Sequence, residues 1–252
     1  MYYIRGVLLA LIALQANAQD ITQEEPLKAS EAQVQQWIIK ADSYRSPFTS
    51  GEFNTSLTLY KNSSKVETSK FFVQLNEQGD SRVTMLDKRS KGQKVLLTDR
   101  AMWLYIPRTR KAIRITPMQR LMGQASYGDV SSLNWQHEYQ WDKSEITEQT
   151  INEQKSRCFM VKAIRKSATY RTIKLCLDSH SSRPIKADFY LASGKLMKQA
   201  AFHHSADSPE IIDQTIFTQP GKTNQYTIMH NSNYSQKTHK ATLFTRQGFI
   251  KK

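Results

Sequence analysis

The chain has 252 residues, 36 of them Lys or Arg and 22 Asp or Glu, so its formal net charge at pH 7 is +14. This length suits one large β domain or two small ones. After residue 18 no segment has the roughly 20 apolar residues of a membrane-spanning helix, which excludes a helical membrane bundle. The positive field favours anionic partners such as phospholipid headgroups, acidic protein faces or nucleic acid. The alternative is that the charge serves solubility alone.

The first 18 residues have the pattern of a secretory signal peptide. Arg5 supplies the positive end, residues 7–14 form a short apolar run, and Ala16-Asn17-Ala18 is a small-x-small cleavage site. We therefore expect a signal peptide over residues 1–18 and an exported chain, 19–252, located in a periplasm. Export argues against nucleic acid as the partner. The alternative interpretation of the apolar run is a buried N-terminal helix.

A helix is expected over residues 31–43. Ser30 resembles an N-cap, with Gln33 at the third helical position. Pro47 prevents the helix from continuing. Apolar side chains recur at i, i+3, i+4 and i+7 and share one face: Val34, Trp37, Ile38 and Ala41. The pattern predicts an amphipathic helix that packs on an apolar surface.

After Pro47 the chain has mostly strand patterns. Strands are expected over residues 52–60, 70–75, 81–86, 94–98, 102–106, 111–115, 137–146, 157–164, 170–177, 184–191, 196–203, 211–217 and 226–230. Pro117 and Gly123 suit the start and end of a helical turn, and another short helix fits within residues 127–133. A single antiparallel sheet of this size must curl or close. We therefore predict a mainly β fold with an α lid: one curled antiparallel sheet, a half-open β-barrel, covered by the helix at 31–43 and a mid-chain helical insert.

The two cysteines lie on either side of a predicted hairpin. A hairpin centred on Ser167 places Cys158 directly opposite Cys176. Opposed residues in an antiparallel pair lie about 4.5–5.5 Å apart at Cα, which is within disulfide range. In an oxidising compartment we expect a disulfide bond. The alternatives are two buried free thiols and, less favoured because Cys-x-x-Cys spacing is absent, a redox-active pair.

Aromatic and basic residues gather between Arg100 and Arg120, where six basic residues and no acidic residue occur. In a strand over 102–106, Trp103 and Tyr105 share one face and the apolar residues between them share the other. Pro107 then begins a sharp turn. The combination suggests a surface for an amphiphile with an anionic part.

Two sets of candidate site residues follow from this segment and the N-terminal helix. Methionine adapts to variable apolar ligands, and Trp and Tyr combine apolar area with a polar edge; arginine suits phosphate oxygens. The candidate lipid-facing residues are Trp37, Ile38, Trp103, Tyr105, Met118, Leu121 and Met122. The candidate contacts to a phosphate, an anionic membrane or a partner are Arg108, Arg110, Lys111, Arg114 and Arg120. The competing interpretations are ordinary core for the first set and a solvated turn for the second.

The sequence contains no catalytic or metal-binding motif. His203 and His204 are adjacent, so on a strand they point to opposite faces, which is poor spacing for metal ligands. His-Glu-x-x-His, Cys-x-x-Cys and Gly-x-Ser-x-Gly patterns are absent. The sequence alone does not exclude a Ser-His-Asp triad, because the members of a triad are brought together only by folding. We expect no enzyme activity, no catalytic residue, no metal and no cofactor.

Five motifs between residues 91 and 130 carry a resemblance to a known family. They are Lys-Gly-Gln-Lys-Val-Leu-Leu at 91–97, Met-Trp-Leu-Tyr-Ile-Pro at 102–107, Arg-Lys-Ala-Ile-Arg-Ile at 110–115, Gln-Arg-Leu-Met-Gly at 119–123 and Tyr-Gly-Asp-Val at 127–130. The chain resembles the outer-membrane lipoprotein-sorting proteins of the LolA/LolB superfamily, in particular the branch found beside RND/MMPL-type exporters. The resemblance implies a half-open β-barrel with helices as a lid. It also implies non-covalent binding and transfer of lipid or lipoprotein acyl chains across the periplasm.

Two functions of different classes are therefore carried forward. The first is a periplasmic carrier that holds a lipid or an acylated lipoprotein in an apolar groove and transfers it toward the outer membrane. The second is an accessory module that docks on an RND/MMPL-type inner-membrane exporter through the basic face at residues 108–120 and has no lipid cargo.

Overall fold

The computed structural model describes residues 27–131, 134–166, 168–204 and 208–250. The predicted signal peptide at residues 1–18 lies outside these ranges. The predicted N-terminal helix is present as α1, Glu31–Arg45, where the Ser30 side chain accepts a hydrogen bond from the backbone N–H of Gln33 (3.2 Å). Its apolar face is buried through Val34, Ile38 and Ala41. The N-cap and the apolar spacing thus correctly predicted this helix.

Strands make up most of the remaining chain. The first half contains β1 (Gly51–Lys61), β2 (Ser64–Leu75), β3 (Ser81–Met85), β4 (Lys94–Leu97), β5 (Met102–Ile106), β6 (Lys111–Ile115), β7 (Arg120–Met122), β8 (Ala125–Ser126), α2 (Tyr127–Ser131) and α3 (Trp135–Glu138). The second half contains β9 (Tyr139–Trp141), β10 (Thr147–Ile151), β11 (Gln154–Ala163), β12 (Thr172–Asp178), β13 (Pro184–Tyr190), β14 (Leu196–His204), β15 (Ile212–Thr218), β16 (Gln225–Gln236), the 3-10 helix η1 (Ala241–Phe244) and α4 (Arg246–Ile250). None of the described helices is long and apolar enough to cross a membrane.

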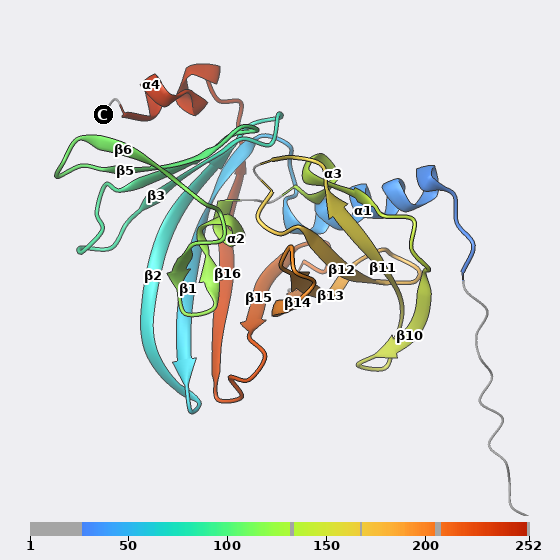
Figure 1. Cartoon of the computed structure of the whole chain (residues 1–252). Coiled ribbons are helices and arrows are strands. Elements are labelled where there is room, and N and C mark those ends of the chain that lie inside the picture. The colour runs from blue at the N-terminus through green and yellow to red at the C-terminus, as the bar shows by residue number, and fades with distance from the viewer. Residues whose placement is uncertain (1–26, 132–133, 167, 205–207, 251–252) are drawn as a thin grey trace, which may run out of the picture.

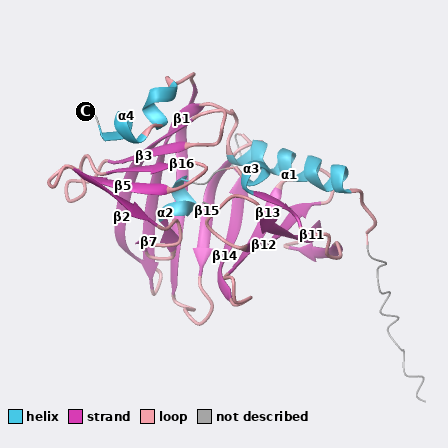
Figure 2. Cartoon of the chain, turned by 45° about the horizontal axis from the view of Figure 1, so that its top comes forward, coloured by secondary structure: helices cyan, strands magenta, loops and turns pink. Residues whose placement is uncertain are grey.

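One 14-stranded antiparallel sheet organises the molecule. Its strand order is β10-β11-β12-β13-β14-β15-β16-β1-β2-β3-β4-β5-β6, with β9 paired to β11. The last strand therefore pairs with the first, and the sheet ends at β10 and β6, so it is curled but not closed (Figure 1). The helices α1 and α3 lie together at one end of the curl, and α2 lies inside it (Figures 1 and 2). The predicted half-open barrel with a helical lid is confirmed.

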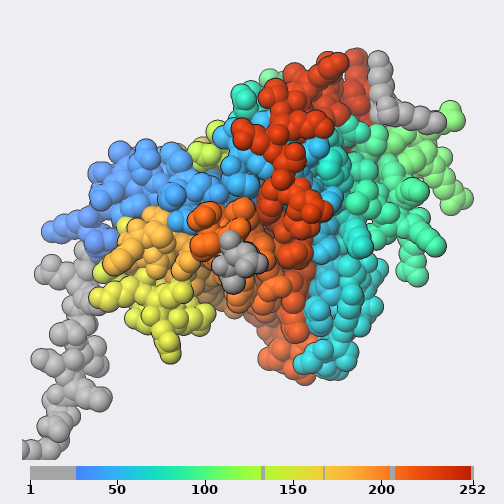
Figure 3. Space-filling model, turned by 180° about the vertical axis from the view of Figure 1, so that it is seen from behind, coloured from blue at the N-terminus to red at the C-terminus, as the bar shows by residue number. Residues whose placement is uncertain are grey.

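The two faces of the β4–β6 region carry separate cores. Met102 and Leu104 of β5 face the concave side and join the main core. Trp103 and Tyr105 face the convex side, where Phe244 of η1 and Phe249 of α4 cover them. Figure 3 shows this C-terminal segment (red) beside the green strands of the sheet. The predicted alternation along residues 102–106 is confirmed, and the C-terminal helix that covers its convex face was not predicted.

The helical turn expected at Pro117 is replaced by the β7–β8 hairpin. Gly123 makes the turn with a φ of +53°, and a Cβ atom there would lie 2.2 Å from the Thr227 hydroxyl oxygen of β16. The hairpin thus packs directly on the main sheet, at a distance that only glycine permits. Long-range packing on β16 therefore overrides the helical signal of Pro117. The mid-chain helical insert begins later, at α2, within the range 127–133 where a short helix was expected.

The strand expected at 137–146 is wrong over most of its length. Residues 135–138 form α3, and strand pairing with β11 covers only 139–141. The reason is a cap supplied from another element: the backbone N–H of Gln136 donates to the carboxylate of Asp42 in α1 (2.7 Å). A carboxylate at the start of a helix satisfies its free N–H groups and favours its dipole, and no local pattern reveals it.

The cysteine prediction is confirmed. Cys158 of β11 pairs with Cys176 of β12 in a hairpin centred on residue 167, and their Cα atoms are 4.1 Å apart. The two sulfur atoms are bonded. The bridge therefore joins neighbouring strands of the sheet, next to its β10 edge.

Candidate functional site

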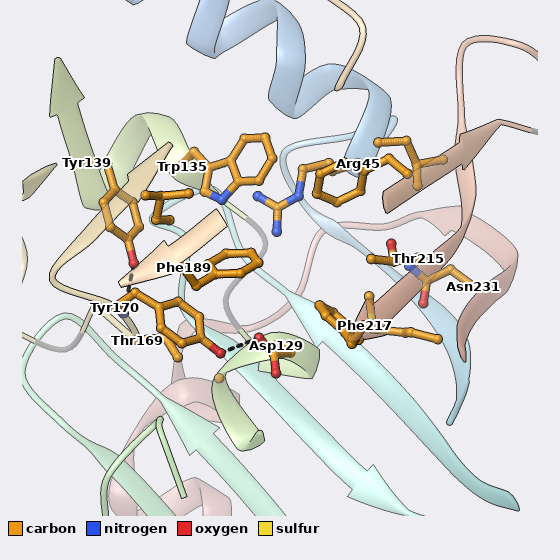
Figure 4. A pocket seen from close by; sticks show the side chains of 15 residues that line it. Arg45, Asp129, Trp135, Tyr139, Thr169, Tyr170, Phe189, Thr215, Phe217 and Asn231 are labelled. Carbon is orange, nitrogen blue, oxygen red and sulfur yellow. Dashed lines mark hydrogen bonds between the residues drawn. The ribbon is translucent and has the colours of Figure 1, made fainter. Parts of the chain in front are cut away.

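A cavity lies inside the curled sheet, beneath the helices. Its walls come from α1, α2, α3, β9, the segment before β12 and the strands β12 to β16 (Figure 4). The lining residues are Arg45, Gly128, Asp129, Trp135, Tyr139, Thr169, Tyr170, Ile173, Phe189, Phe202, Ile212, Thr215, Phe217, Met229 and Asn231. The space open to the centre of a water-sized sphere is about 30 Å³, which suffices for one or two waters and is far too small for an acyl chain. A larger ligand therefore requires the walls to move apart.

Aromatic side chains dominate the wall. Trp135 of α3 packs edge-on against Phe202 of β14, with ring centroids 5.8 Å apart. Tyr170 and Phe189 pack at 4.5 Å on the opposite side. Aromatic rings bury large apolar areas where another group packs on them. The wall is therefore chemically suited to apolar ligands.

A buried ion pair lies at the base of the cavity. The ammonium group of Lys198 in β14 contacts the carboxylate of Asp129 in α2, and the two side chains are only 2% and 3% exposed. The Tyr170 hydroxyl donates to Asp129 Oδ1 (2.8 Å), and the Ser126 backbone N–H donates to Asp129 Oδ2 (2.6 Å). Lys198 also donates to the carbonyl oxygen of Gln124 (3.2 Å). These partners satisfy the charges, as burial in apolar surroundings requires.

Burial shifts the ionisation of the groups around this pair. It lowers the pKa of Lys198, against the opposing effect of the Asp129 charge. It raises the pKa of Tyr170 well above its usual value, and the negative charge of Asp129 raises it further. Burial likewise raises the pKa of Tyr139, whose hydroxyl accepts a hydrogen bond from the Tyr170 backbone N–H (3.1 Å). Both phenols therefore stay protonated, so the hydrogen bond to Asp129 persists at neutral pH.

A second polar network joins the helices over the cavity. The guanidinium of Arg45, at the end of α1, lies 3.9 Å from the centroid of the Trp135 ring (Figure 4). Arg45 also pairs with Asp42 (3.2 Å), which in turn accepts the Gln136 N–H that begins α3. Burial raises the pKa of Asp42, and the charge of Arg45 opposes this rise. The network fastens α1 to α3 above the aromatic wall.

One buried hydroxyl on the cavity wall has no hydrogen-bond partner among the described residues: Oγ1 of Thr169. Gly128 packs against it so closely that a Cβ atom there would lie 2.0 Å from this oxygen. Within the same stretches of chain, no group of His, Cys, Asp or Glu side chains is arranged to hold a metal ion.

The predicted lipid-facing residues do not form one surface, and none of them lines this cavity. Ile38 and Met122 are buried in the main core, and Trp37 and Leu121 pack against it. Met118 lies beside a separate small cavity with Lys198 and Arg120. Trp103 and Tyr105 lie on the convex face. Strand alternation carries these two side chains to the side of the sheet opposite Met102 and Leu104.

The five predicted cationic residues are all exposed, but they lie in separate parts of the surface. Arg108, Arg110 and Lys111 lie at the β5–β6 turn, and Arg114 lies opposite Trp103 on β6. Arg120 is on β7, beside the small cavity inside the curl. The expected single basic face therefore does not include Arg120, because the β7–β8 hairpin folds it back onto the main sheet.

The sequence did contain signals for the buried pair that were not used. Asp129 belongs to the Tyr-Gly-Asp-Val motif of the family resemblance. Lys198 shares its strand face with Ala200 and Phe202, so a charge interrupts an apolar period-two pattern. A lysine on an apolar strand face requires a buried partner, which predicts a carboxylate nearby without naming it.

Several solved structures have a fold similar to that of this chain. A LolA superfamily protein from Nitrosomonas europaea is 23% identical, with a TM-score of 0.75 over 87% of this chain and 100% of that one. An outer membrane lipoprotein-sorting protein domain from Vibrio parahaemolyticus is 19% identical, with a TM-score of 0.65 over 85% of this chain and 97% of that one. A DUF1329 family protein from Desulfovibrio piger is 15% identical, with a TM-score of 0.64 over 85% and 96%.

No curated protein matches the chain. A family model described as "Uncharacterized protein" matches residues 79–250, which include β3–β16 and all residues that line the cavity except Arg45 of α1. The chain therefore belongs to this family of uncharacterized proteins, and its fold is that of the LolA superfamily.

Proposed function

We propose that the protein is a periplasmic carrier that binds the acyl chain of a lipid or lipoprotein between the curled sheet and the α1–α3 lid. The observation that carries this proposal is the aromatic cavity lined by the sheet and covered by α1 and α3, which polar contacts join to each other over it. The likeness of the fold to a LolA superfamily protein and to a lipoprotein-sorting protein domain supports the same class of cargo.

The energetics suit a reversible carrier. Burial of an acyl chain gains about 0.8 kcal/mol per CH₂ group, so a 16-carbon chain gains on the order of 10 kcal/mol. Opening the lid breaks the contacts of Asp42 with Gln136 and of Arg45 with Trp135, and it exposes the apolar face of α1. Each polar contact contributes about 1–3 kcal/mol, and exposing apolar side chains adds a further cost. These costs offset part of the gain from the acyl chain, which allows a carrier to release its cargo.

Native mass spectrometry of protein purified from the periplasm, followed by lipid extraction, tests the proposal. We expect a stoichiometric lipid that organic solvent removes, and stripped protein that takes up a dansylated fatty acid. Met229→Trp fills the cavity with a larger side chain and is expected to lower uptake at least tenfold. Leu86→Trp, which adds the same ring at an exposed position, is the matched control and leaves uptake unchanged.

If the purified protein holds no lipid and does not bind the dansylated fatty acid, the proposed carrier function is wrong. In that case the docking module of an RND/MMPL-type exporter takes its place. The exposed cations of the β5–β6 turn, Arg108, Arg110 and Lys111, are its candidate contacts, and reversing their charge then abolishes co-purification with the exporter.

A further inference from the structure

Two segments without acidic residues meet on the convex face of the sheet. No Asp or Glu occurs from Arg100 to Arg120, and none occurs after Asp213. These segments are far apart in sequence, but η1 and α4 pack on β4 and β5 through Phe244 and Phe249 (Figures 1 and 3). Packing therefore concentrates positive charge on one face to a degree that neither segment reaches alone.

Three arginines and the indole of Trp103 line one surface depression at this junction. Arg246 of α4 lies with its guanidinium 4.6 Å from the centroid of the Trp103 ring. Arg114 lies directly opposite Trp103 in the β5–β6 pair, and its guanidinium donates to the carbonyl oxygen of Arg100 (3.4 Å). Together with Leu96 and Ala101 these residues line a shallow, mostly apolar depression, here called the convex arginine patch.

The charges of the convex arginine patch are not neutralised within the described part of the chain. In residues 27–131, 134–166, 168–204 and 208–250, none of the three arginines forms an ion pair with a carboxylate. The nearest acid in sequence, Asp99, pairs instead with Arg165 (2.6 Å). All three arginines are exposed. The patch thus presents guanidinium groups available to an external anion.

We infer that the convex arginine patch docks the protein on an anionic phospholipid membrane. Guanidinium groups suit phosphate oxygens through paired hydrogen bonds. Half-buried Trp103 adds aromatic surface within the patch, and half-buried Leu243 and Ile250 pack against the same apolar cluster beneath it, which suits the boundary between headgroups and acyl chains. An acidic protein face would match the charge but not this apolar floor. The inference goes beyond the proposed carrier function and does not depend on it, because the patch lies on the side of the sheet opposite the cavity.

Vesicle flotation tests the inference with cargo-stripped protein. We expect binding to vesicles of phosphatidylglycerol and phosphatidylcholine, little binding to pure phosphatidylcholine, and loss of binding as salt rises. The triple variant Arg100→Gln, Arg114→Gln, Arg246→Gln is expected to lower the partition coefficient about 100-fold, at about tenfold or less per cation. The charge-preserving triple variant to Lys is expected to retain binding within about tenfold.

A matched control removes three charges elsewhere on the surface. Lys61, Lys65 and Lys195 are exposed and lie outside the patch, and their change to Gln lowers the net charge by the same amount. We expect this control to bind within about threefold of the unaltered protein. Equal losses in the two Gln variants would overturn the patch, because net charge alone then accounts for binding. Binding that is equal on neutral vesicles would also overturn it.

Two further outcomes distinguish membrane docking from binding of free phosphate and from binding of an acidic protein. If millimolar inorganic phosphate releases the protein where chloride of equal ionic strength does not, the site takes free phosphate and the membrane is excluded. If the protein ignores all vesicles but co-purifies with an acidic partner through these arginines, the occupant is a protein. Uptake of the dansylated fatty acid, measured in the same variants, is expected to stay unchanged, so failure of the carrier and failure of the patch give different results.

Discussion

Asp129 of α2 and Lys198 of β14 form an ion pair that is almost fully buried, and it fastens the inner insert to the main sheet. Further hydrogen bonds join the insert, β7–β8 and α2, to the sheet. The Thr227 hydroxyl donates to Gln124 Oε1 (2.8 Å), and the Ser81 hydroxyl donates to the carbonyl oxygen of Ser131 (2.6 Å). The floor of the cavity is therefore held by contacts between residues far apart in sequence, and the ion pair is one of them.

Breaking the pair is expected to destabilise the fold strongly. Asp129→Asn leaves the Lys198 ammonium buried without a counter-charge, and Lys198→Met does the same to the carboxylate. Each change is expected to cost about 3–5 kcal/mol of unfolding free energy. The double variant is expected to cost less than the sum of the two, since neither charge is then left alone. Urea unfolding of all four proteins measures the coupling, and additive losses would contradict it.

Alkaline pH is expected to destabilise the protein through Tyr170. Burial, followed by the charge of Asp129, raises its pKa in the folded state above that in the unfolded state. The folded protein then holds this proton more tightly, so the stability it contributes is complete below about pH 10 and is lost as pH rises further. Tyr170→Phe removes this titration.

The Tyr170→Phe variant is expected to lose about 1.5–3 kcal/mol at neutral pH, because Asp129 loses a hydrogen bond to a charged acceptor. Above pH 10 the difference between the two proteins is expected to shrink. Unfolding curves recorded from pH 7 to pH 11 test this, and a difference that does not change with pH would show that Tyr170 does not titrate as argued.

The tie between α1 and α3 is expected to control the rate of ligand entry. Asp42→Ala removes the acceptor of the Gln136 N–H and the partner of Arg45. We expect faster uptake of a dansylated fatty acid in stopped-flow fluorescence, together with a stability loss of about 1–3 kcal/mol. Ser30→Ala is the matched control, since it weakens α1 at its other end by about 1 kcal/mol. Equal acceleration in both variants would mean that helix stability, not the tie, sets the rate.

Reduction of the Cys158–Cys176 bond is expected to lower stability without changing the fold. The bond closes a loop with a sequence separation of 18 residues, for which the chain-entropy estimate is about 3 kcal/mol. Urea unfolding of the oxidised protein and of the Cys158→Ser, Cys176→Ser double variant measures this difference. The variant is expected to keep its circular dichroism spectrum, because hydrogen bonds already pair β11 with β12. Equal midpoints would contradict the estimate.

Local patterns predicted the parts of the fold that depend on neighbours in sequence. The α1 helix follows from its N-cap and the spacing of Val34, Ile38 and Ala41. The Cys158–Cys176 register follows from hairpin symmetry. Patterns were misleading where a distant element intervened. Asp42 in α1 caps the start of α3, and Gly123 in the β7–β8 turn packs against Thr227 in β16. Both contacts join residues about 100 positions apart, beyond the reach of any periodicity.

The sequence by itself determined that Trp103 and Tyr105 share one face of a strand and Met102 and Leu104 the other, because side chains on a strand alternate. Only the tertiary structure decided which face lines the inside of the curl. The pairing of β1 with β16 joins the two halves of the chain into one curled sheet, and the C-terminal helix covers the outside of the curl. The Asp129–Lys198 pair has the same origin: its members are 69 residues apart, and only the curling of the sheet around α2 brings their charges together where both side chains are buried.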